Sequence, residues 1–476
     1  MTVNAESDVR STLMVPGPPV PLALKLEANG IGVPIRTQKQ KRTERVQLGA
    51  FCALSFLSGW ADGSIGPLIP KIQEFYHLSY TIVSLIFVFK CIGYVLGSIA
   101  NILFTKKYGF GRMLLFGSTL QIISHALQIL AIIAPFEVFI LGNFFLGAGQ
   151  ALHNSQSTGY IASLRISPKT KMGIFQAFYG AGCLFSPLVA TKFSNLPERG
   201  HWAFCYLVGL GLTLINLVDV WFVFRGRPQN VCLGLIGQLA DDEAQQTAVF
   251  AAEVERYAPS PPNTASVLPE GAPAPAPVRP VLWRSRESYV GEMLSLKSLH
   301  LLAVFLFIYV GTEVTVSGWI VSFVLQVRGG GSASGYTASA FWGGFTVGRV
   351  ALLPLNKWLG EPRAMYIYPL LCIGLELILL LVPSFPASAT AASLIGLLFG
   401  PIFPMGINHA ARILPVSLLT PCIAWLSGFA SIGGALFPFF TGAIIGRVGF
   451  KSMPIVTIGM LGAMLATWWV VPRARK

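Results

Sequence analysis

Two carboxyl residues, Asp62 and Glu313, lie deep within apolar stretches of this sequence. An ionisable side chain inside a membrane is costly, so it faces water or a partner, and such groups often relay protons. Ser58 shares a helical face with Asp62, and Tyr309 and Thr312 share one with Glu313. Because the two positions match, we predict a proton-coupling pair that lines a central cavity. The alternatives are that Asp62 caps or bends its helix and that Glu313 pairs with a basic group.

Lys90 lies in the middle of the next apolar stretch. Its depth differs from that of Asp62 by about one helical turn, roughly 5 Å. The two residues can therefore form an ion pair, which would hold Asp62 ionised and argue against a proton carrier. Alternatively, the long side chain of Lys90 reaches toward the membrane surface.

A stripe of polar residues runs along one face of the predicted helix 137–161. A polar stripe inside lipid must face protein or water. We expect it to line the substrate cavity together with Ser58, Tyr309 and Thr312, or else to hold neighbouring helices together. The stripe consists of Gln150, His153, Asn154 and Ser157, and Gln176 and Tyr179 start a similar face in the predicted helix 171–194.

Basic residues surround glycine at two matching turns. Arg112 follows the turn after the predicted helix 79–104, and Lys357 and Arg363 flank the turn after the predicted helix 334–356. Matching positions of this kind indicate a duplicated bundle. We predict that these residues and Arg349, near the inner end of helix 334–356, form a cytosolic gate. For Arg349 the alternative is a role in holding the helix terminus.

Twelve apolar stretches must position these residues. Each is long enough to cross a hydrocarbon core of roughly 30 Å, which takes about 20 helical residues. Backbone amides in lipid must be paired within their own segment, so the stretches are helices. We predict an all-α membrane protein with two pseudo-symmetric six-helix bundles. The stretches cover 46–70, 79–104, 112–134, 137–161, 171–194 and 202–224, then 299–326, 334–356, 364–383, 387–409, 417–445 and 452–471.

The placement of charge gives the topology. The chain has 476 residues, of which only 11% are charged, yet its net charge is +14. Of the 34 Lys and Arg residues, 26 fall in the two tails and in the loops on their side, whereas six fall in the opposite loops. Because positive charge stays on the cytosolic side, we expect both termini and the central loop to be cytosolic. The basic excess thus reports membrane topology and does not indicate nucleic-acid binding.

The predicted organisation has five parts. A disordered cytosolic tail (1–45) precedes the first bundle (46–224), and a Pro-rich cytosolic loop (225–297) leads to the second bundle (298–472) and a short tail (473–476). Pro259–Pro280 is too rich in proline to pack a core. We expect this loop to be a solvated tether, with regulation or partner binding as the alternative. Residues Ser285–Leu299 can form an amphipathic helix on the membrane surface.

Several classes of protein are disfavoured. The sequence lacks a His-Glu-x-x-His motif, a Gly-x-Ser-x-Gly motif and a nucleotide-binding Gly-x-x-x-x-Gly-Lys-Ser/Thr loop. We therefore expect no enzyme, no nucleotide-driven pump, and no metal or cofactor. The expected partners of this monomer are a small-molecule substrate, protons and membrane lipids. A nutrient sensor that signals through its cytosolic loops is the alternative to a transporter.

The run Gly59–Pro70 resembles fungal major facilitator superfamily proteins related to the fucose:proton symporter, of the bypass-of-stop-codon type. Gly311–Phe323, Gly344–Pro354 and Gly400–Pro404 share this resemblance. It implies a central cavity, alternating access and proton coupling, with Asp62 as the helix-1 carboxylate. The implied substrate is a sugar-like compound for uptake or a secondary metabolite for export. We expect the plasma membrane as the protein's location, with the vacuole or another endomembrane as alternatives.

The sequence departs from this family at the carboxylate expected in the predicted helix 137–161. Asn154 stands in its place. An amide cannot exchange a proton near neutral pH, so the symporter proton path of the family is incomplete here. The proton-coupling prediction consequently rests on Asp62 and Glu313.

Overall fold

The computed structural model describes residues 36–198, 200–238, 291–415 and 418–472, and this part of the chain forms helices and no strand. Each of the twelve predicted apolar segments coincides with one helix or with two successive helices. The predicted all-α membrane class is confirmed. The stretch Pro259–Pro280 and the first six residues of the proposed amphipathic helix at 285–299 lie outside the described residues, whereas 291–294 are helical.

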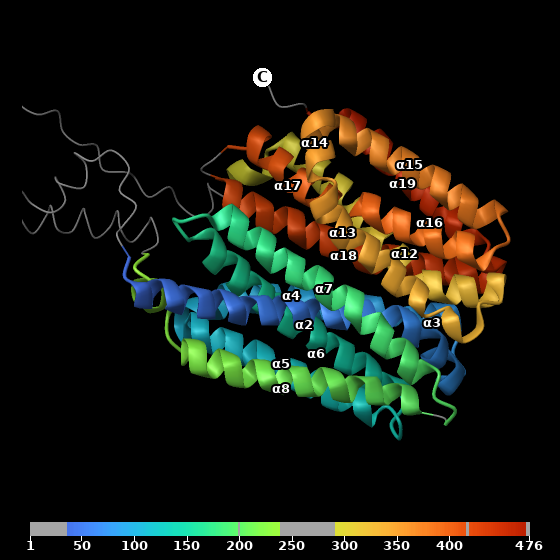
Figure 1. Cartoon of the computed structure of the whole chain (residues 1–476), viewed down its shortest axis with the longest axis horizontal. Helices are drawn as coiled ribbons and strands as arrows, with labels where there is room; N and C mark the ends of the chain where they lie inside the picture. The colour runs from blue at the N-terminus through green and yellow to red at the C-terminus, as the bar shows by residue number, and fades with distance from the viewer. Residues whose placement is uncertain (1–35, 199, 239–290, 416–417, 473–476) are drawn as a thin grey trace, which may run out of the picture.

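The first six segments form one bundle and the last six form another, as Figure 1 shows in blue to green and in yellow to red. The first contains α2 (Gln38–Tyr76), α3 (Tyr80–Val83) with α4 (Leu85–Tyr108), α5 (Phe110–Leu130), α6 (Phe136–Ala162), α7 (Pro168–Ser194) and α8 (Cys205–Phe224) after the turn η1 (His201–Phe204). The second contains α12 (Lys297–Arg328), η2 (Gly331–Ala333), α13 (Tyr336–Ala351) with α14 (Leu353–Leu359), α15 (Glu361–Leu381), α16 (Phe385–Phe399) with α17 (Ile402–Ile413), α18 (Leu419–Val448) and α19 (Ser452–Val470).

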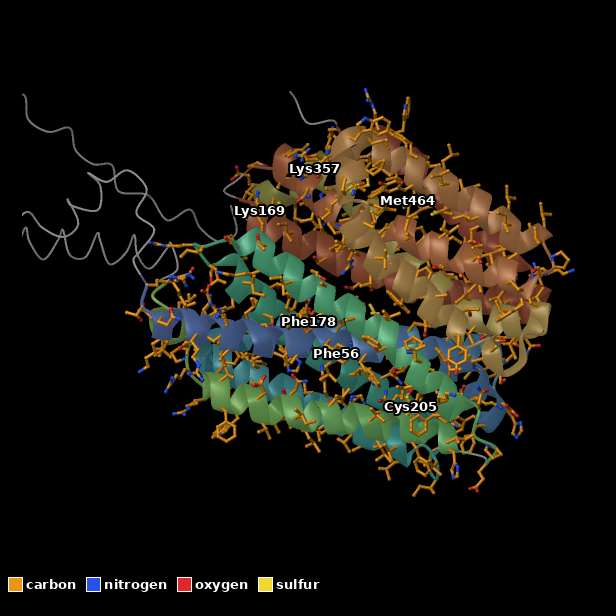
Figure 2. The ribbon with its side chains drawn as sticks, viewed as in Figure 1. Phe56, Lys169, Phe178, Cys205, Lys357 and Met464 are labelled. Atoms are coloured by element: carbon orange, nitrogen blue, oxygen red, sulfur yellow. The ribbon has the colours of Figure 1, made fainter. Side chains whose placement is uncertain are left out.

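Both bundles have the same two ends. We call the end at which α2 begins and α19 finishes the terminal end, and the opposite end the distal end. Lys169 and Lys357 mark the terminal end in Figure 2, whereas Cys205 lies toward the distal end. In each bundle, two segments run from the terminal end to the distal end and back before the predicted gate turn. The turns at Gly109 and Gly360 therefore both lie at the terminal end.

Nine helical segments in the described residues are individually long and apolar enough to cross a membrane. The segments that fall short are α2, α6 and α13, and they hold Asp62, Gln150 and Arg349. Polar side chains lower the hydropathy of α2 and α6, and α13 ends at Ala351, just before Pro354. The helices that depart most from a lipid-like composition are therefore those that carry the candidate site.

Several boundaries differ from the prediction, and α2 extends past its predicted segment at both ends, to Tyr76. Helix α2 begins at Gln38 rather than at residue 46, because Thr37 and Gln40 form a reciprocal capping box that starts the helix early. Residues from Gln38 onward are thus helical and not part of a disordered tail. The start of the predicted central loop is also ordered, since α9 (Gln229–Leu235) packs Cys232 and Leu233 into the core of the first bundle.

Glu44 joins three segments at the terminal end of the first bundle. Its carboxylate contacts Arg36 and Lys171, and it accepts a hydrogen bond of 2.8 Å from Gln238 Nε2. Burial alone would raise the pKa of Glu44, but the hydrogen bonds from Lys171 and Arg36 outweigh burial, so the pKa is lowered from its ordinary value of 4.5. Gln238 Oε1 also accepts from the backbone amide of Arg165 at 2.8 Å. This cluster fastens the start of the central loop to the bundle.

We predict that Glu44→Gln destabilises the protein by about 3 kcal/mol, because two cations lose their buried partner. The lowered pKa means that this stabilisation is complete above pH 4.5 and is lost as the pH falls through the folded-state pKa. Thermal unfolding of purified protein in detergent, measured across this pH range, tests the effect. The control is Glu74→Gln, because Glu74 pairs with Lys71 on the surface with 69% of its side chain exposed. Equal melting temperatures for the two variants would contradict the prediction.

Candidate substrate and proton site

Asp62 is the centre of a polar cluster in the first bundle. Its Oδ1 contacts Lys90 Nζ and accepts a hydrogen bond of 3.1 Å from Gln150 Nε2. Its Oδ2 accepts a hydrogen bond of 2.8 Å from the hydroxyl of Tyr179. Four helices, α2, α4, α6 and α7, thus contribute one side chain each. The predicted Lys90–Asp62 ion pair is present in the structure.

Two glycines allow these helices to approach closely enough. A Cβ atom at Gly59 would lie 2.0 Å from the carbonyl oxygen of Tyr179, and one at Gly147 would lie 1.9 Å from the carbonyl oxygen of Lys90. Any larger residue would push α7 away from α2, or α4 away from α6. Helix packing therefore sets the distance from Asp62 to its partners.

The ion pair is partly exposed. The side chains of Asp62 and Lys90 are 25% and 26% exposed. Cys91, next to Lys90, donates a hydrogen bond of 3.5 Å to the carbonyl oxygen of Ser431 in α18. This contact shows that α4 faces the second bundle at this depth. The pair thus lies near the contact between α4 and α18, and its side chains are not sealed inside the first bundle.

Arg349 enters the same region from α13 in the second bundle. Its Nη1 donates to the carbonyl oxygen of Gln176 at 3.1 Å and to the side-chain Oε1 of Gln176 at 3.4 Å. The guanidinium lies 4.5 Å from the ring centre of Phe345 and 5.7 Å from that of Tyr179. Tyr179 thus touches both Asp62 and Arg349. Arg349 lies deeper than Arg112, Lys357 and Arg363, which are exposed at the terminal end.

The second predicted carboxylate, Glu313, is 8% exposed in α12. It lies beside Tyr309, within electrostatic range of Arg349 and Asp62. The Tyr309 hydroxyl donates to the carbonyl oxygen of Phe399 at 2.9 Å, and Thr312 bonds to its own helix at the carbonyl oxygen of Ile308. The structure therefore brings Glu313 toward Asp62, while Tyr309 and Thr312 make their hydrogen bonds inside the second bundle.

The polar stripe of α6 is divided between two faces. Gln150 reaches Asp62 and the carbonyl oxygen of Ser58, and Asn154 donates to the hydroxyl of Tyr94 at 2.9 Å. His153 instead faces α5, where its Nε2 donates to the carbonyl oxygen of Leu114 at 3.1 Å and its Nδ1 is 3.3 Å from Gln121 Nε2. Ser157 is fully buried, and its hydroxyl has no partner among the described residues.

Sequence reasoning missed the position of Arg349 relative to Asp62 and the role of Tyr94 as the partner of Asn154. The available signal for Arg349 was that it is one of two cations inside the predicted helices. The residues at the distal end also escaped prediction. There Asn195 donates to the carbonyl oxygen of Ser332 at 2.9 Å, and the rings of Tyr80 and Phe450 lie 4.9 Å apart.

These distal contacts join the two bundles. In the described residues, the hydrogen bonds between the bundles lie at mid-depth or toward the distal end, and none joins their terminal ends. These contacts hold the bundles together at the distal end, around a cavity of about 510 Å³ that both bundles line with residues such as Pro67, Tyr80, Asn195 and Ser332. The described residues also contain no group of three or more His, Cys, Asp or Glu side chains that could hold a metal ion.

We predict that Asp62→Asn destabilises the protein by about 1–3 kcal/mol, because it leaves the Lys90 ammonium without a carboxylate at membrane depth. Adding Lys90→Met removes the unpaired charge and restores the melting temperature. A double-mutant cycle in purified protein measures the coupling. Additive effects of the two substitutions would show that the ion pair does not stabilise the fold.

A family profile described as Major Facilitator Superfamily matches residues 51–391. Bypass of stop codon protein 6 of Saccharomyces cerevisiae is 24% identical over 91% of this chain and 83% of its own length. The glucose/mannose transporter GlcP of Bacillus subtilis is 22% identical over 86% of this chain and 92% of its own length. Among solved structures, a D-xylose-proton symporter superposes with a TM-score of 0.67 at 11% identity, covering 90% of this chain and 98% of that one.

These matches confirm the resemblance to fungal superfamily members and the expectation of a transporter rather than an enzyme. The family profile covers well over half of the chain, and the superposed structure has the same fold. The chain is an integral, multi-pass membrane protein that belongs to the Major Facilitator Superfamily.

Proposed function

We propose that this protein moves a small polar organic molecule across a membrane by alternating access and couples this movement to protons through Asp62. The observation that carries the proposal is the Asp62 cluster, in which an accessible carboxylate is held by Lys90, Gln150 and Tyr179 at the face between the bundles. Protons and a substrate from the same space can reach such a group.

The cluster suggests how a proton changes the structure. The ion pair with Lys90 opposes protonation of Asp62, so the proposed coupling requires the pair to separate during the transport cycle. Protonation removes the negative charge and weakens the contact, so Lys90 is free to find another acceptor. Lys90 belongs to α4, which faces α18 of the second bundle. Protonation at Asp62 can therefore alter the contact between the bundles, as coupled transport requires.

Glu313 is proposed as a second acidic group on the opposite side of the interface. It is buried in α12, and its field reaches Asp62. Two carboxyl groups of like charge in one site influence each other's protonation. This arrangement supports the proposal that both carboxyls take part in proton exchange, with Asp62 as the more accessible one.

Bundles that are joined at the distal end but not at the terminal end support alternating access. With the predicted cytosolic termini, this state faces the cytosol, and the contacts at Tyr80 and Asn195 must separate to open the other side. The exposed residues Arg112, Lys357 and Arg363 at the terminal end are proposed to form contacts in the opposite state.

The substrate class is proposed from the relatives and from the polar lining. The Bacillus subtilis relative is named as a glucose and mannose transporter, and the superposed structure as a xylose-proton symporter. Gln150, Asn154, Gln176 and Tyr179 supply hydrogen-bonding groups suited to a polyhydroxylated compound. We therefore propose a sugar-like substrate; export of a secondary metabolite would use the same site.

We predict that Asp62→Asn in the Lys90→Met background abolishes accumulation driven by a pH gradient but retains substrate exchange. The amide keeps the hydrogen bonds and loses the exchangeable proton, and the double variant avoids the unpaired ammonium. Proteoliposomes tested with glucose, mannose, xylose, galactose and their uronic or aldonic acids give the readout.

The control for this experiment is Asp219→Asn, which removes an acid from α8 that makes no contact with the Asp62 cluster. This variant should accumulate substrate as the unaltered protein does. Accumulation by the Asp62 double variant at the unaltered rate would contradict the proposed coupling. The absence of saturable flux for every compound would contradict the proposed substrate class.

A further inference from the structure

The charge of Arg349 is not balanced by an ion pair. Its Nη1 bonds only to the main-chain carbonyl and side-chain amide of Gln176, and its Nε is buried without a partner. Among the described residues, no carboxylate lies within ion-pair distance of the guanidinium. A guanidinium at membrane depth is costly unless water or an anion faces it. Arg349 therefore has unused hydrogen-bonding capacity.

Lys90, the other cation at this depth, does not lack an ion-pair partner. Lys90 is already engaged by Asp62, whose oxygens are also occupied by Gln150 and Tyr179. The carboxylate of Asp62 is consequently not a free acceptor for substrate hydroxyl groups in this state. The centre of the molecule presents an occupied acid and an unpaired guanidinium, which favours an anionic ligand over a neutral one.

Glu313 is an alternative partner for Arg349. The Glu313 carboxylate interacts electrostatically with Arg349 but forms no ion pair with the guanidinium. It lies beside Tyr309. The two aromatic rings near Arg349, those of Phe345 and Tyr179, stack on a guanidinium without neutralising it. Neither aromatic ring supplies the planar pair of acceptor oxygens that matches a guanidinium.

We propose that the transported molecule carries a carboxylate and that Arg349 binds this group. The proposal rests on the proposed transport function and specifies its substrate as a polar organic acid, such as a polyhydroxy acid, in place of a neutral sugar. The carboxylate takes the acceptor position that Gln176 now occupies, and the polar side chains around Asp62 bind the rest of the molecule.

This assignment gives a physical reason for coupling. Tyr179 contacts both Asp62 and Arg349, so an anion bound at Arg349 lies next to the Asp62 carboxylate. Two adjacent negative charges repel each other, and a proton on Asp62 removes the repulsion. Binding of the anion and binding of the proton therefore favour one another, and by linkage each promotes the other.

Matched ligand pairs test the inference in purified full-length protein. Thermal shifts are measured with gluconate against sorbitol and with galacturonate against galactose, at constant ionic strength set with sodium chloride. We expect stabilisation by an acid and none by its neutral partner. Arg349→Gln should weaken acid binding by about 10- to 100-fold. Arg349→Lys should retain part of it, because the charge remains without the planar fork.

The control variant is Arg447→Gln, since Arg447 is exposed at the distal end of α18 and should bind the acids as the unaltered protein does. The inference is overturned if neutral partners stabilise the protein as well as the acids do, if Arg349→Gln binds acids normally, or if no acid binds. These outcomes leave the Asp62 coupling test unaffected, because that test can be read with a neutral substrate. Conversely, acid binding through Arg349 without a proton-driven flux would contradict only the proposed coupling.

Discussion

The ion pair between Lys90 and Asp62 is the interaction on which the rest of this structure depends. Either charge alone at membrane depth would be unfavourable, and together they allow a polar centre inside an apolar molecule. The pair requires α2, α4, α6 and α7 to cross closely, which Gly59 and Gly147 permit. We propose that its partial exposure makes the same pair available to protons. The Asp62 cluster thus links the close helix contacts at Gly59 and Gly147 with the polar side chains of α6 and α7.

Much of the fold could be predicted because lipid imposes a simple rule on sequence. Apolar stretches of sufficient length located the twelve long helical segments, and the depth of Lys90 relative to Asp62 predicted their contact. Helix ends were harder to predict, since the early start of α2 depends on the capping box at Thr37. The fastening of α9 by Gln238 and Glu44 joins residues far apart in the chain, which hydropathy does not report.

The candidate site was predictable in residue type but not in arrangement. A stripe at helical spacing does not reveal which neighbour each member faces, so Gln150 reaches Asp62 while His153 faces α5. Arg349 was expected near the inner end of its helix, and α13 does end at Ala351. The structure also places the guanidinium over Tyr179 of the first bundle, which the sequence did not indicate. Such pairings arise from the meeting of two bundles, which no local pattern encodes.

The central claim is that Asp62 exchanges a proton with the space between the bundles. Infrared difference spectroscopy of the full-length protein, titrated over the pH range in which it stays folded, tests this claim most directly. We predict a carboxylic-acid C=O band that grows as the pH falls and is missing in the Asp62→Asn, Lys90→Met double variant but present in Asp219→Asn. A spectrum in which no titrating band is lost on replacing Asp62 would contradict the account and leave the ion pair a purely structural element.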